Sequence, residues 1–239
     1  TQGLPISCFL SMIPDSKEGL VAARSEAAWL SMMGGGISVY AANRSVDSKS
    51  TGVMAHLKGY DSDTLSYRQT ATRRGSMAAY LDIDHPEIVS FLEMRDPTGG
   101  DSNKKCFNLN NATNLTDSYM HAVINGTSYP LIDPKHGATG KTLDAREIWE
   151  LQMNLRFNTG EPYTTFIDNI NNRLPIQITN PDYRVRQSNL CVAPETLILT
   201  DKGYLPIASL EGEQVKVWNS KEWSEVTIIK TGTNQPLIT

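Results

Sequence analysis

Gln-Ser-Asn-Leu-Cys-Val-Ala-Pro-Glu-Thr, residues 187–196, is the stretch in which the character of the chain changes. Before it, short apolar runs alternate with segments whose apolar residues recur at helical spacing, which is typical of an α/β domain. After it, short runs of β-branched and aromatic residues are separated by turn sequences, which is typical of an all-β unit. The sequence therefore predicts two domains, residues 1–190 and 191–239, that meet at the Leu190–Cys191 peptide bond.

The composition of the 239 residues limits the classes of protein to consider. Hydrophobic residues make up 39% and charged residues 20%, an ordinary globular mix. The net charge of −4 argues against a nucleic-acid partner, and no apolar run is long enough to span a membrane. Three sparse cysteines favour a reducing, cytoplasmic location. The first residues lack a start Met and the features of a signal peptide, which predicts a chain cut in mid-sequence.

Strands and helices are expected to alternate through residues 1–190. Capping-box patterns at Asp15 and Glu18, and at Asp144 and Glu147, indicate two helix starts. The predicted elements are strands at residues 4–13, 37–42, 76–83, 107–109 and 163–167, helices at 16–33, from His85 onward, at 117–124 and between Asp144 and Gly160, and polar loops at 44–72 and 96–105. Beyond Cys191, strands are predicted at residues 196–200, 214–218 and 225–230, with a turn at 201–203.

Two patterns suggest sites that we do not expect to exist. Residues 137–142, Gly-Ala-Thr-Gly-Lys-Thr, end like a phosphate-binding loop, but Lys135 stands where that motif needs glycine. A polar loop leading into a helix cap is favoured there. Asp82, Asp84 and His85 could together suggest a metal site, but no second group of ligands accompanies them. A helix-capping role is favoured for them, and no metal site is expected.

Several motifs together resemble the large (alpha) subunit of class I ribonucleotide reductase. They are Pro-Ile-Ser-Cys at 5–8, the glycines at 34–36, Arg-Arg-Gly at 73–75, Ala-Ala-Tyr-Leu-Asp-Ile-Asp-His-Pro-Glu-Ile at 78–88, Thr-Gly at 159–160 and Arg-Gln-Ser-Asn-Leu at 186–190. The resemblance covers residues 1–190. It implies part of a ten-stranded α/β barrel and the reduction of ribonucleoside diphosphates to deoxyribonucleotides. In that reaction a thiyl radical activates the ribose, and a cysteine pair supplies two electrons.

The resemblance places one group of residues at the substrate. Cys8 matches one member of the reducing pair, and Asn189 matches a residue that hydrogen-bonds the reacting ribose. Ser7 and the backbone at Gly35 would lie beside the substrate. The resemblance further implies that thioredoxin or glutaredoxin supplies the electrons for the reduction.

A second group of residues matches the region that binds deoxynucleotide or ATP effectors. Asp15, Ser16 and Arg44 belong to it, and the Arg44 guanidinium could pair with phosphate. Lys49 is a further candidate for the same task. The resemblance also implies a homodimer of the full-length subunit and a separate small (beta) subunit that supplies a metal-generated radical. The chain itself is expected to bind no metal and no other cofactor.

The chain departs from this family at its catalytic loop. The family motif continues Asn-Leu-Cys-x-Glu, with the glutamate as general base, and Ala193 holds that position. The second cysteine of the reducing pair is also missing, because Cys106 lies in an unrelated segment. We therefore expect this chain alone to be inactive.

Residues 191–200, Cys-Val-Ala-Pro-Glu-Thr-Leu-Ile-Leu-Thr, resemble the first block of an intein, a self-splicing insert. Gly-Tyr-Leu-Pro-Ile at 203–207 and Val-Lys-Val-Trp-Asn at 215–219 resemble the next segments of that family. This implies a small all-β Hint fragment that needs a C-terminal intein portion as partner. Cys191 would be the splicing nucleophile, whose sulfur attacks the Leu190 carbonyl to give a thioester.

Three interpretations stay open from the sequence. The leading one is a piece of a reductase large subunit that is interrupted by the start of an intein. The second is half of a split intein that ligates proteins in trans, with another polypeptide as partner. The third is an inactive nucleotide-binding module that keeps the effector site.

Overall fold

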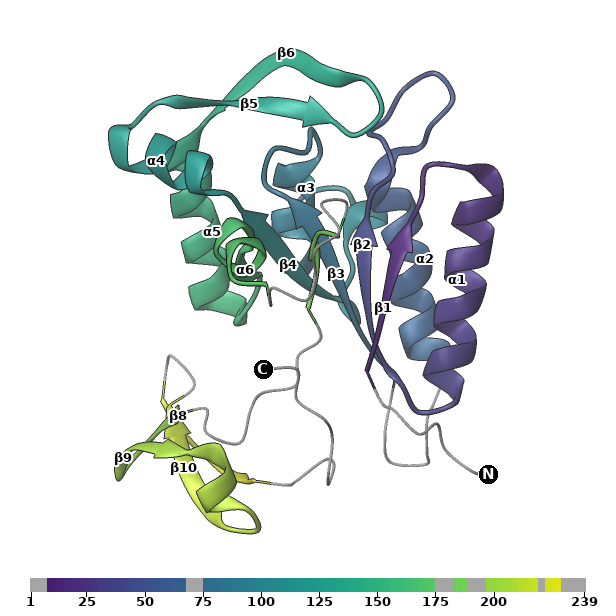
Figure 1. Cartoon of the computed structure of the whole chain (residues 1–239). Coiled ribbons are helices and arrows are strands. Elements are labelled where there is room, and N and C mark those ends of the chain that lie inside the picture. Colours follow the sequence, from purple (N-terminus) through teal and green to yellow (C-terminus); the bar gives the residue numbers. More distant parts are fainter. Residues whose placement is uncertain (1–7, 68–74, 175–182, 189–196, 219–221, 229–239) are drawn as a thin grey trace. The chain divides into compact units, whose positions relative to one another are not determined.

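The computed structural model describes residues 8–67, 75–174, 183–188, 197–218 and 222–228. The chain divides into two compact units, Thr1–Asn189 and Leu190–Thr239 (Figure 1). Each unit is treated by itself below. Within the described residues, no helix combines the length and apolar character that a membrane crossing requires.

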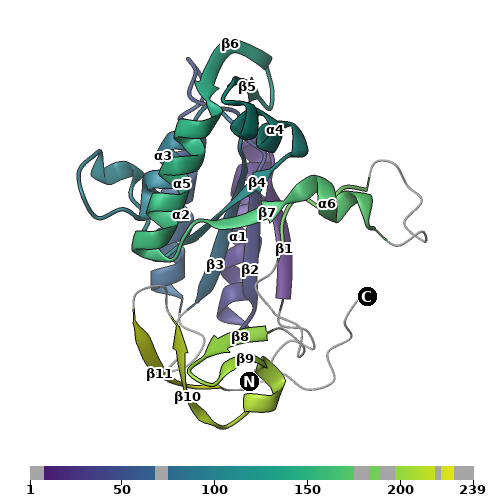
Figure 2. The same cartoon turned by 90° about the vertical axis from the view of Figure 1, so that its left-hand side faces the viewer.

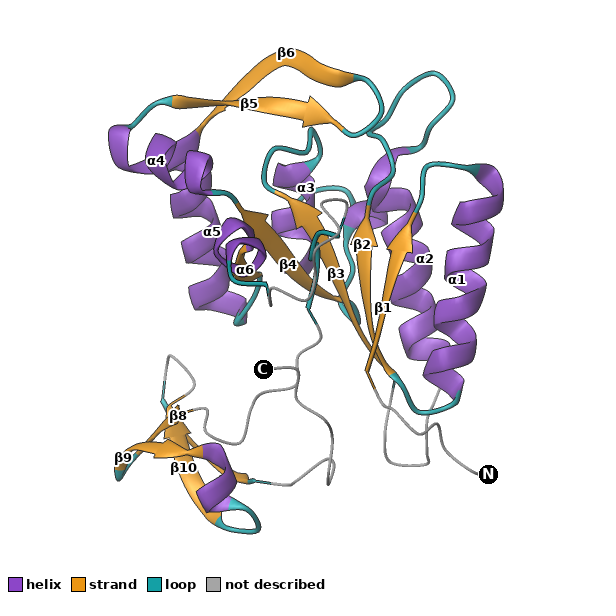
Figure 3. Ribbon diagram, viewed as in Figure 1, coloured by secondary structure: helices purple, strands orange, loops and turns teal. Residues whose placement is uncertain are grey.

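A five-stranded parallel sheet is the framework of the first unit (Figure 3). Its order is β1-β2-β3-β4-β7, so neighbouring strands follow the order of the chain. The strands are β1 (Cys8–Ile13), β2 (Gly36–Ala41), β3 (Ser76–Asp82), β4 (Asn110–Leu115) and β7 (Tyr163–Phe166). Because all five run in parallel, the residues that follow them gather at one edge of the sheet and the residues that precede them at the other.

Helices pack against this sheet, with the longer ones on one face. The helices are α1 (Lys17–Met32), α2 (Gly52–Ser66), α3 (Ile88–Leu92), α4 (Asp117–Asn125), α5 (Ala145–Thr159) and α6 (Ile167–Asn172). Figure 2 shows α2, α3 and α5 on one side of the sheet and α6 on the other. Ile37 and Val39 of β2 and Met77 and Ala79 of β3 point into the main core with the first group. The alternate residues of the same strands face the opposite side, as the two-residue period of a strand requires.

The second face of the sheet carries a smaller cluster with polar neighbours. Tyr40, Ala78, Tyr80 and Ala112 form its buried apolar part. Asn114 of β4 belongs to the same alternation and is 1% exposed. A face of this mixed character can bind polar chain segments as well as pack apolar ones.

A two-stranded hairpin crosses the carboxyl edge of the sheet. It consists of β5 (Ser128–Asp133) and β6 (Gly137–Asp144), and it lies at the top of Figure 1. The prediction of a polar loop at residues 137–142 is therefore wrong, because these residues form most of β6. Residues 138–142 are all exposed, so β6 lacks the alternation of apolar and polar side chains from which a strand is predicted.

The largest local error of the sequence prediction concerns residues 44–72, where α2 replaces the expected polar loop. Val53, Leu57 and Tyr60 are buried at helical spacing, but Asp61 and Thr64 share the same buried face. The Asp61 carboxylate accepts the backbone N–H groups of residues 108 and 109 at 2.6 and 3.0 Å. These buried polar residues, which have hydrogen-bond partners, interrupt the helical spacing of apolar residues on which the prediction depended.

Other boundaries also differ from the prediction. β4 begins at Asn110 and replaces the strand expected at 107–109, since its run of Asn and Thr residues did not resemble a strand. The N-cap of α1 is Ser16 rather than Asp15, because the Ser16 hydroxyl accepts the N–H of Gly19 at 3.0 Å. The helix expected from His85 begins three residues later, at Ile88. The predicted Asp144 cap of α5 is confirmed.

Apart from one 3-10 helical turn at Ile207–Leu210, the described residues of the second unit form only β-strands and loops. Its antiparallel sheet has the order β11-β10-β8-β9. The strands are β8 (Leu197–Thr200), β9 (Gly203–Pro206), β10 (Gln214–Trp218) and β11 (Trp223–Thr227). The predicted strands at 196–200 and 214–218 are found, β11 overlaps the third, and β9 was not predicted. Among the described residues of this unit, the buried hydrophobic ones are Leu210 and Val215, at 4% and 5% exposure.

Candidate functional site

Residues 183–188, which lead toward the Leu190–Cys191 bond, are bound to the second face of the parallel sheet. The Gln187 amide donates to the Ser11 carbonyl of β1 at 2.8 Å and accepts from the Ser38 hydroxyl of β2 at 3.0 Å. The Asn114 amide of β4 donates to the Arg186 carbonyl at 2.7 Å. The guanidinium carbon of Arg186 lies 5.5 Å from the centre of the Tyr40 ring of β2. Contacts with three strands therefore fix this segment across the sheet.

A second anchor fixes the same segment at its start. The Asn171 side chain of α6 accepts the N–H of Val185 at 2.8 Å and donates to its carbonyl at 2.9 Å. These two hydrogen bonds hold the start of the segment against α6. Asn189 and Cys191 come within a few residues but lie, like Ser7, outside the described residues.

Cys8 begins β1 at the amino edge of the sheet and is half-buried. Its Cα is paired in register with Gly36 of β2. A Cβ at the preceding Gly35 would stand 2.7 Å from the Phe9 ring and 3.0 Å from the Leu30 carbonyl, so only glycine fits there. The structure thus brings together Cys8 and the glycines that the sequence placed beside it.

The predicted effector residues lie at the opposite edge of the sheet. Asp15 follows β1 and Arg44 follows β2, whereas Cys8 precedes most of β1. A strand rises about 3.3 Å per residue, so roughly 20 Å separate Cys8 from Asp15 along the chain. One pair of strands therefore connects the two predicted sites.

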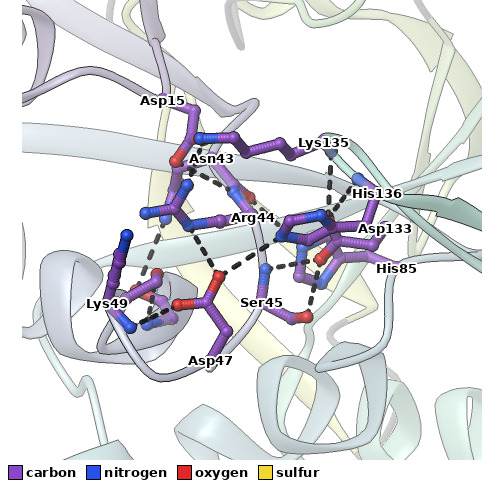
Figure 4. Close-up of polar contacts among 12 residues, drawn as sticks. Asp15, Asn43, Arg44, Ser45, Asp47, Lys49, His85, Asp133, Lys135 and His136 are labelled. Carbon is purple, nitrogen blue, oxygen red and sulfur yellow. Dashed lines mark hydrogen bonds and ion pairs between the residues drawn. The ribbon is translucent and has the colours of Figure 1, made fainter. Parts of the chain in front are cut away.

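Figure 4 shows a cluster of charged side chains around Arg44. The Arg44 guanidinium lies 3.4 Å from the Asp15 carboxylate and 3.1 Å from that of Asp47. The tip of the β5–β6 hairpin adds two further contacts, from Lys135 to Asp15 at 3.6 Å and from His136 to Asp47 at 3.3 Å. Two cations and an imidazole from segments about ninety residues apart thus converge on two carboxylates.

Asp133 joins the hairpin to the loop that carries Arg44. Its carboxylate accepts the backbone N–H and the hydroxyl of Ser45 at 2.8 and 2.6 Å. It also accepts the backbone N–H groups of Lys135 and His136, each at 2.9 Å. Burial alone would raise the pKa of Asp133, but these hydrogen bonds outweigh it and hold the pKa below its usual range.

The remaining predicted effector residues have different surroundings. The Ser16 hydroxyl oxygen is engaged as the N-cap of α1. Lys49 donates its backbone N–H to Asp47 at 2.6 Å. Within the described residues its exposed ammonium group forms no ion pair, so it stays accessible to a ligand. Sequence reasoning missed Asp133, Lys135 and His136, because no local pattern relates the hairpin to the loop after β2.

The acidic group after β3 belongs to the sheet. Asp82 accepts hydrogen bonds from the Tyr40 hydroxyl at 2.5 Å and the Asn114 amide at 2.8 Å. The predicted helix-capping role is therefore wrong for Asp82. Burial and the nearby charge of Asp82 raise the pKa of Asp84 to about 6. Among the described residues, no three His, Cys, Asp or Glu side chains are grouped so that they could hold a metal ion.

The first unit is thus a parallel α/β domain with a thiol at one edge of its sheet, a charged cluster at the other and a chain segment bound across its face. Residues 6–204 match the family model "Ribonucleotide reductase, barrel domain". The chain belongs to this family, and the predicted α/β fold of the ribonucleotide reductase type is confirmed for the first unit.

Two curated viral proteins are similar over much of the chain. The ribonucleoside-diphosphate reductase large subunit of Invertebrate iridescent virus 6 is 47% identical over 244 residues, covering 99% of this chain and 25% of that protein. The "Putative ribonucleoside-diphosphate reductase large subunit" of Frog virus 3 is 46% identical over 190 residues, covering 79% of this chain and 34% of that protein. The chain therefore spans a quarter to a third of these relatives.

A solved structure supports the same fold. The alpha subunit of the class Id ribonucleotide reductase of Actinobacillus ureae is 27% identical and superposes with a TM-score of 0.63. The match covers 82% of this chain and 33% of that subunit.

Proposed function

We propose that residues 1–190 form part of the catalytic barrel of a ribonucleoside-diphosphate reductase large subunit. The observation that carries this proposal is the fixed path of residues 183–188 across the sheet that begins with Cys8. Asn189 and Leu190 follow these residues directly in the sequence, and in the proposed mature enzyme the radical cysteine would be joined to Leu190. Such an arrangement suits a reaction in which one cysteine activates the ribose and another reduces it.

The same proposal gives Cys8 one half of the reducing pair. Its sulfur would form a disulfide with the second cysteine of the pair, which residues 1–190 do not supply, as the 2′-hydroxyl leaves as water, and an external dithiol would reduce that disulfide again. The substrate would be a ribonucleoside diphosphate, and a small subunit would supply the radical. At the other edge of the sheet, Asp15, Arg44 and Lys49 would bind a deoxynucleotide or ATP effector.

Cys8→Ser tests this role in the mature large subunit, assayed with its small subunit. Serine is close in size but cannot form the disulfide, so turnover is expected to fall below about 1% of wild type. Deoxynucleotide binding, measured by equilibrium dialysis, should stay unchanged because the effector region lies at the other edge of the sheet. Turnover near the wild-type rate would show that Cys8 is not one of the two reducing cysteines.

We also propose that residues 191–239 are the N-terminal part of an intein, removed by splicing at Leu190–Cys191. Two observations support this. The chain divides at Leu190 into a second compact unit, and the family's Asn-Leu-Cys-x-Glu motif is broken immediately after Cys191. The match to the barrel family model ends within β9, so it does not itself mark the junction.

A further inference from the structure

We infer that the tip of the β5–β6 hairpin is part of the effector site and that Lys135 binds the phosphates of the nucleotide together with Arg44. This inference rests on the proposed effector role of the loop after β2 and adds a second segment to that site. It assigns a ligand-binding role to residues for which the sequence motifs gave none.

The position of the hairpin tip is fixed by hydrogen bonds. Asp133 binds Ser45 through two bonds of 2.8 and 2.6 Å. One residue earlier, the N–H of Ile132 donates to the Asp84 carbonyl at 2.8 Å. These contacts attach the hairpin to the loops after both β2 and β3. The backbone of Lys135 is therefore held near Arg44 by the structure around it.

The ion pairs in the cluster are long, and the shortest of them joins Arg44 to Asp47 at 3.1 Å. Arg44 and Lys135 approach Asp15 only to 3.4 and 3.6 Å, and His136 approaches Asp47 to 3.3 Å. Charge-assisted N–H···O contacts normally measure about 2.7–2.9 Å. In the same unit, Arg24 binds Asp63 through two such bonds of 2.6 and 2.9 Å. The cations around Asp15 are thus gathered without being fully paired, which leaves them able to bind another anion.

The charges of the cluster favour an anion with several oxygens. The Asp133 charge is already engaged by four donors, two from Ser45 and two from the hairpin backbone. Of the remaining groups, Arg44, Lys49 and Lys135 outnumber the carboxylates Asp15 and Asp47. A positive excess spread over two segments matches a polyphosphate chain better than a single carboxylate.

Arg44 and Lys135 differ in exposure, so they would bind phosphate in different ways. The Arg44 side chain is 15% exposed and fixed between two carboxylates, so it can present a planar pair of donors. The Lys135 side chain is 48% exposed, and its ammonium is a mobile point charge that can follow a phosphate. Lys135 would thus close the site from the side opposite the loop.

Equilibrium binding of dATP to the full chain tests the inference. Lys135→Ala is expected to weaken dATP binding about tenfold, and Lys135→Arg to retain most of it. The matched control is Lys141→Ala, because Lys141 is an exposed lysine of the same hairpin and forms no ion pair within the described residues. Inorganic tripolyphosphate serves as a second probe, and thermal unfolding verifies that each variant is folded.

Equal weakening of dATP and tripolyphosphate binding by Lys135→Ala would support a phosphate contact. Loss confined to dATP would overturn that assignment, because the phosphates alone would then not need Lys135. Wild-type affinity in Lys135→Ala, with binding lost in Arg44→Ala, would overturn the hairpin's role and leave the proposed effector site intact. A wild-type chain that binds no nucleotide would overturn the effector site together with the inference.

Discussion

Replacing Cys191 by alanine is expected to stop all chemistry at the Leu190–Cys191 bond in a precursor that extends the chain through the proposed intein. The proposed first step is attack of the Cys191 sulfur on the Leu190 carbonyl, which converts the peptide bond into a thioester. Alanine has no nucleophile, so neither a thioester nor a spliced product can form. Treatment with hydroxylamine and then intact-mass measurement would detect a product ending at Leu190 from the wild type only.

Cys106→Ala is the matched control for this experiment. Cys106 is fully buried in the first unit, and burial raises the pKa of its thiol to about 12, so it is a poor nucleophile. The control should react like the wild type. Cleavage at Leu190 in the Cys191→Ala precursor would show that the intein assignment is wrong.

Asp133→Ala is expected to lower the free energy of unfolding of the first unit by about 3 kcal/mol, since it removes the acceptor of four hydrogen bonds to a charged group. Asp133 is 3% exposed, so the donors of Ser45 and the hairpin turn would lose their partner away from water. Urea unfolding monitored by circular dichroism at pH 7 measures the loss. Glu150→Ala, which removes an exposed carboxylate of α5, is the control and should change little.

The pH dependence of this effect has a definite sign. The pKa of Asp133 is depressed in the folded state, so its stabilising contribution is present above the unfolded pKa of about 4. The contribution is lost as the pH falls from there through the folded value. The difference between wild type and Asp133→Ala should therefore be constant from pH 5 to 8 and shrink at more acidic pH. A difference that instead grows on acidification would contradict the bonding assigned to Asp133.

The sequence predicted the elements whose patterns are local. β1 and β3 are apolar runs, and α5 begins at a cap formed by Asp144, so each could be recognised within about fifteen residues. α2 could not, because Asp61 and Asp63 are buried in it through bonds to residues 108–109 and to Arg24, which lie far away in the chain.

The candidate sites divide in the same way. Cys8, Asp15 and Arg44 could be proposed from the sequence because each stands in a recognisable motif beside a strand. The contacts of Gln187 with Ser11 and Ser38 span 176 and 149 residues, and no local pattern encodes them. Lys135 likewise joins Asp15 only because the hairpin folds over the sheet edge. Residues that only the topology brings together could be recognised only in the structure.

Peptide mapping of the mature reductase subunit tests the central claim most directly. Trypsin cleaves after Arg186 and Lys202, so the unspliced chain yields a peptide of residues 187–202 that contains Val192-Ala193-Pro194. If residues 191–239 begin an intein, the active subunit must instead yield a peptide that reads Gln-Ser-Asn-Leu-Cys-x-Glu. An active reductase that still contains the peptide of residues 187–202 would contradict the account.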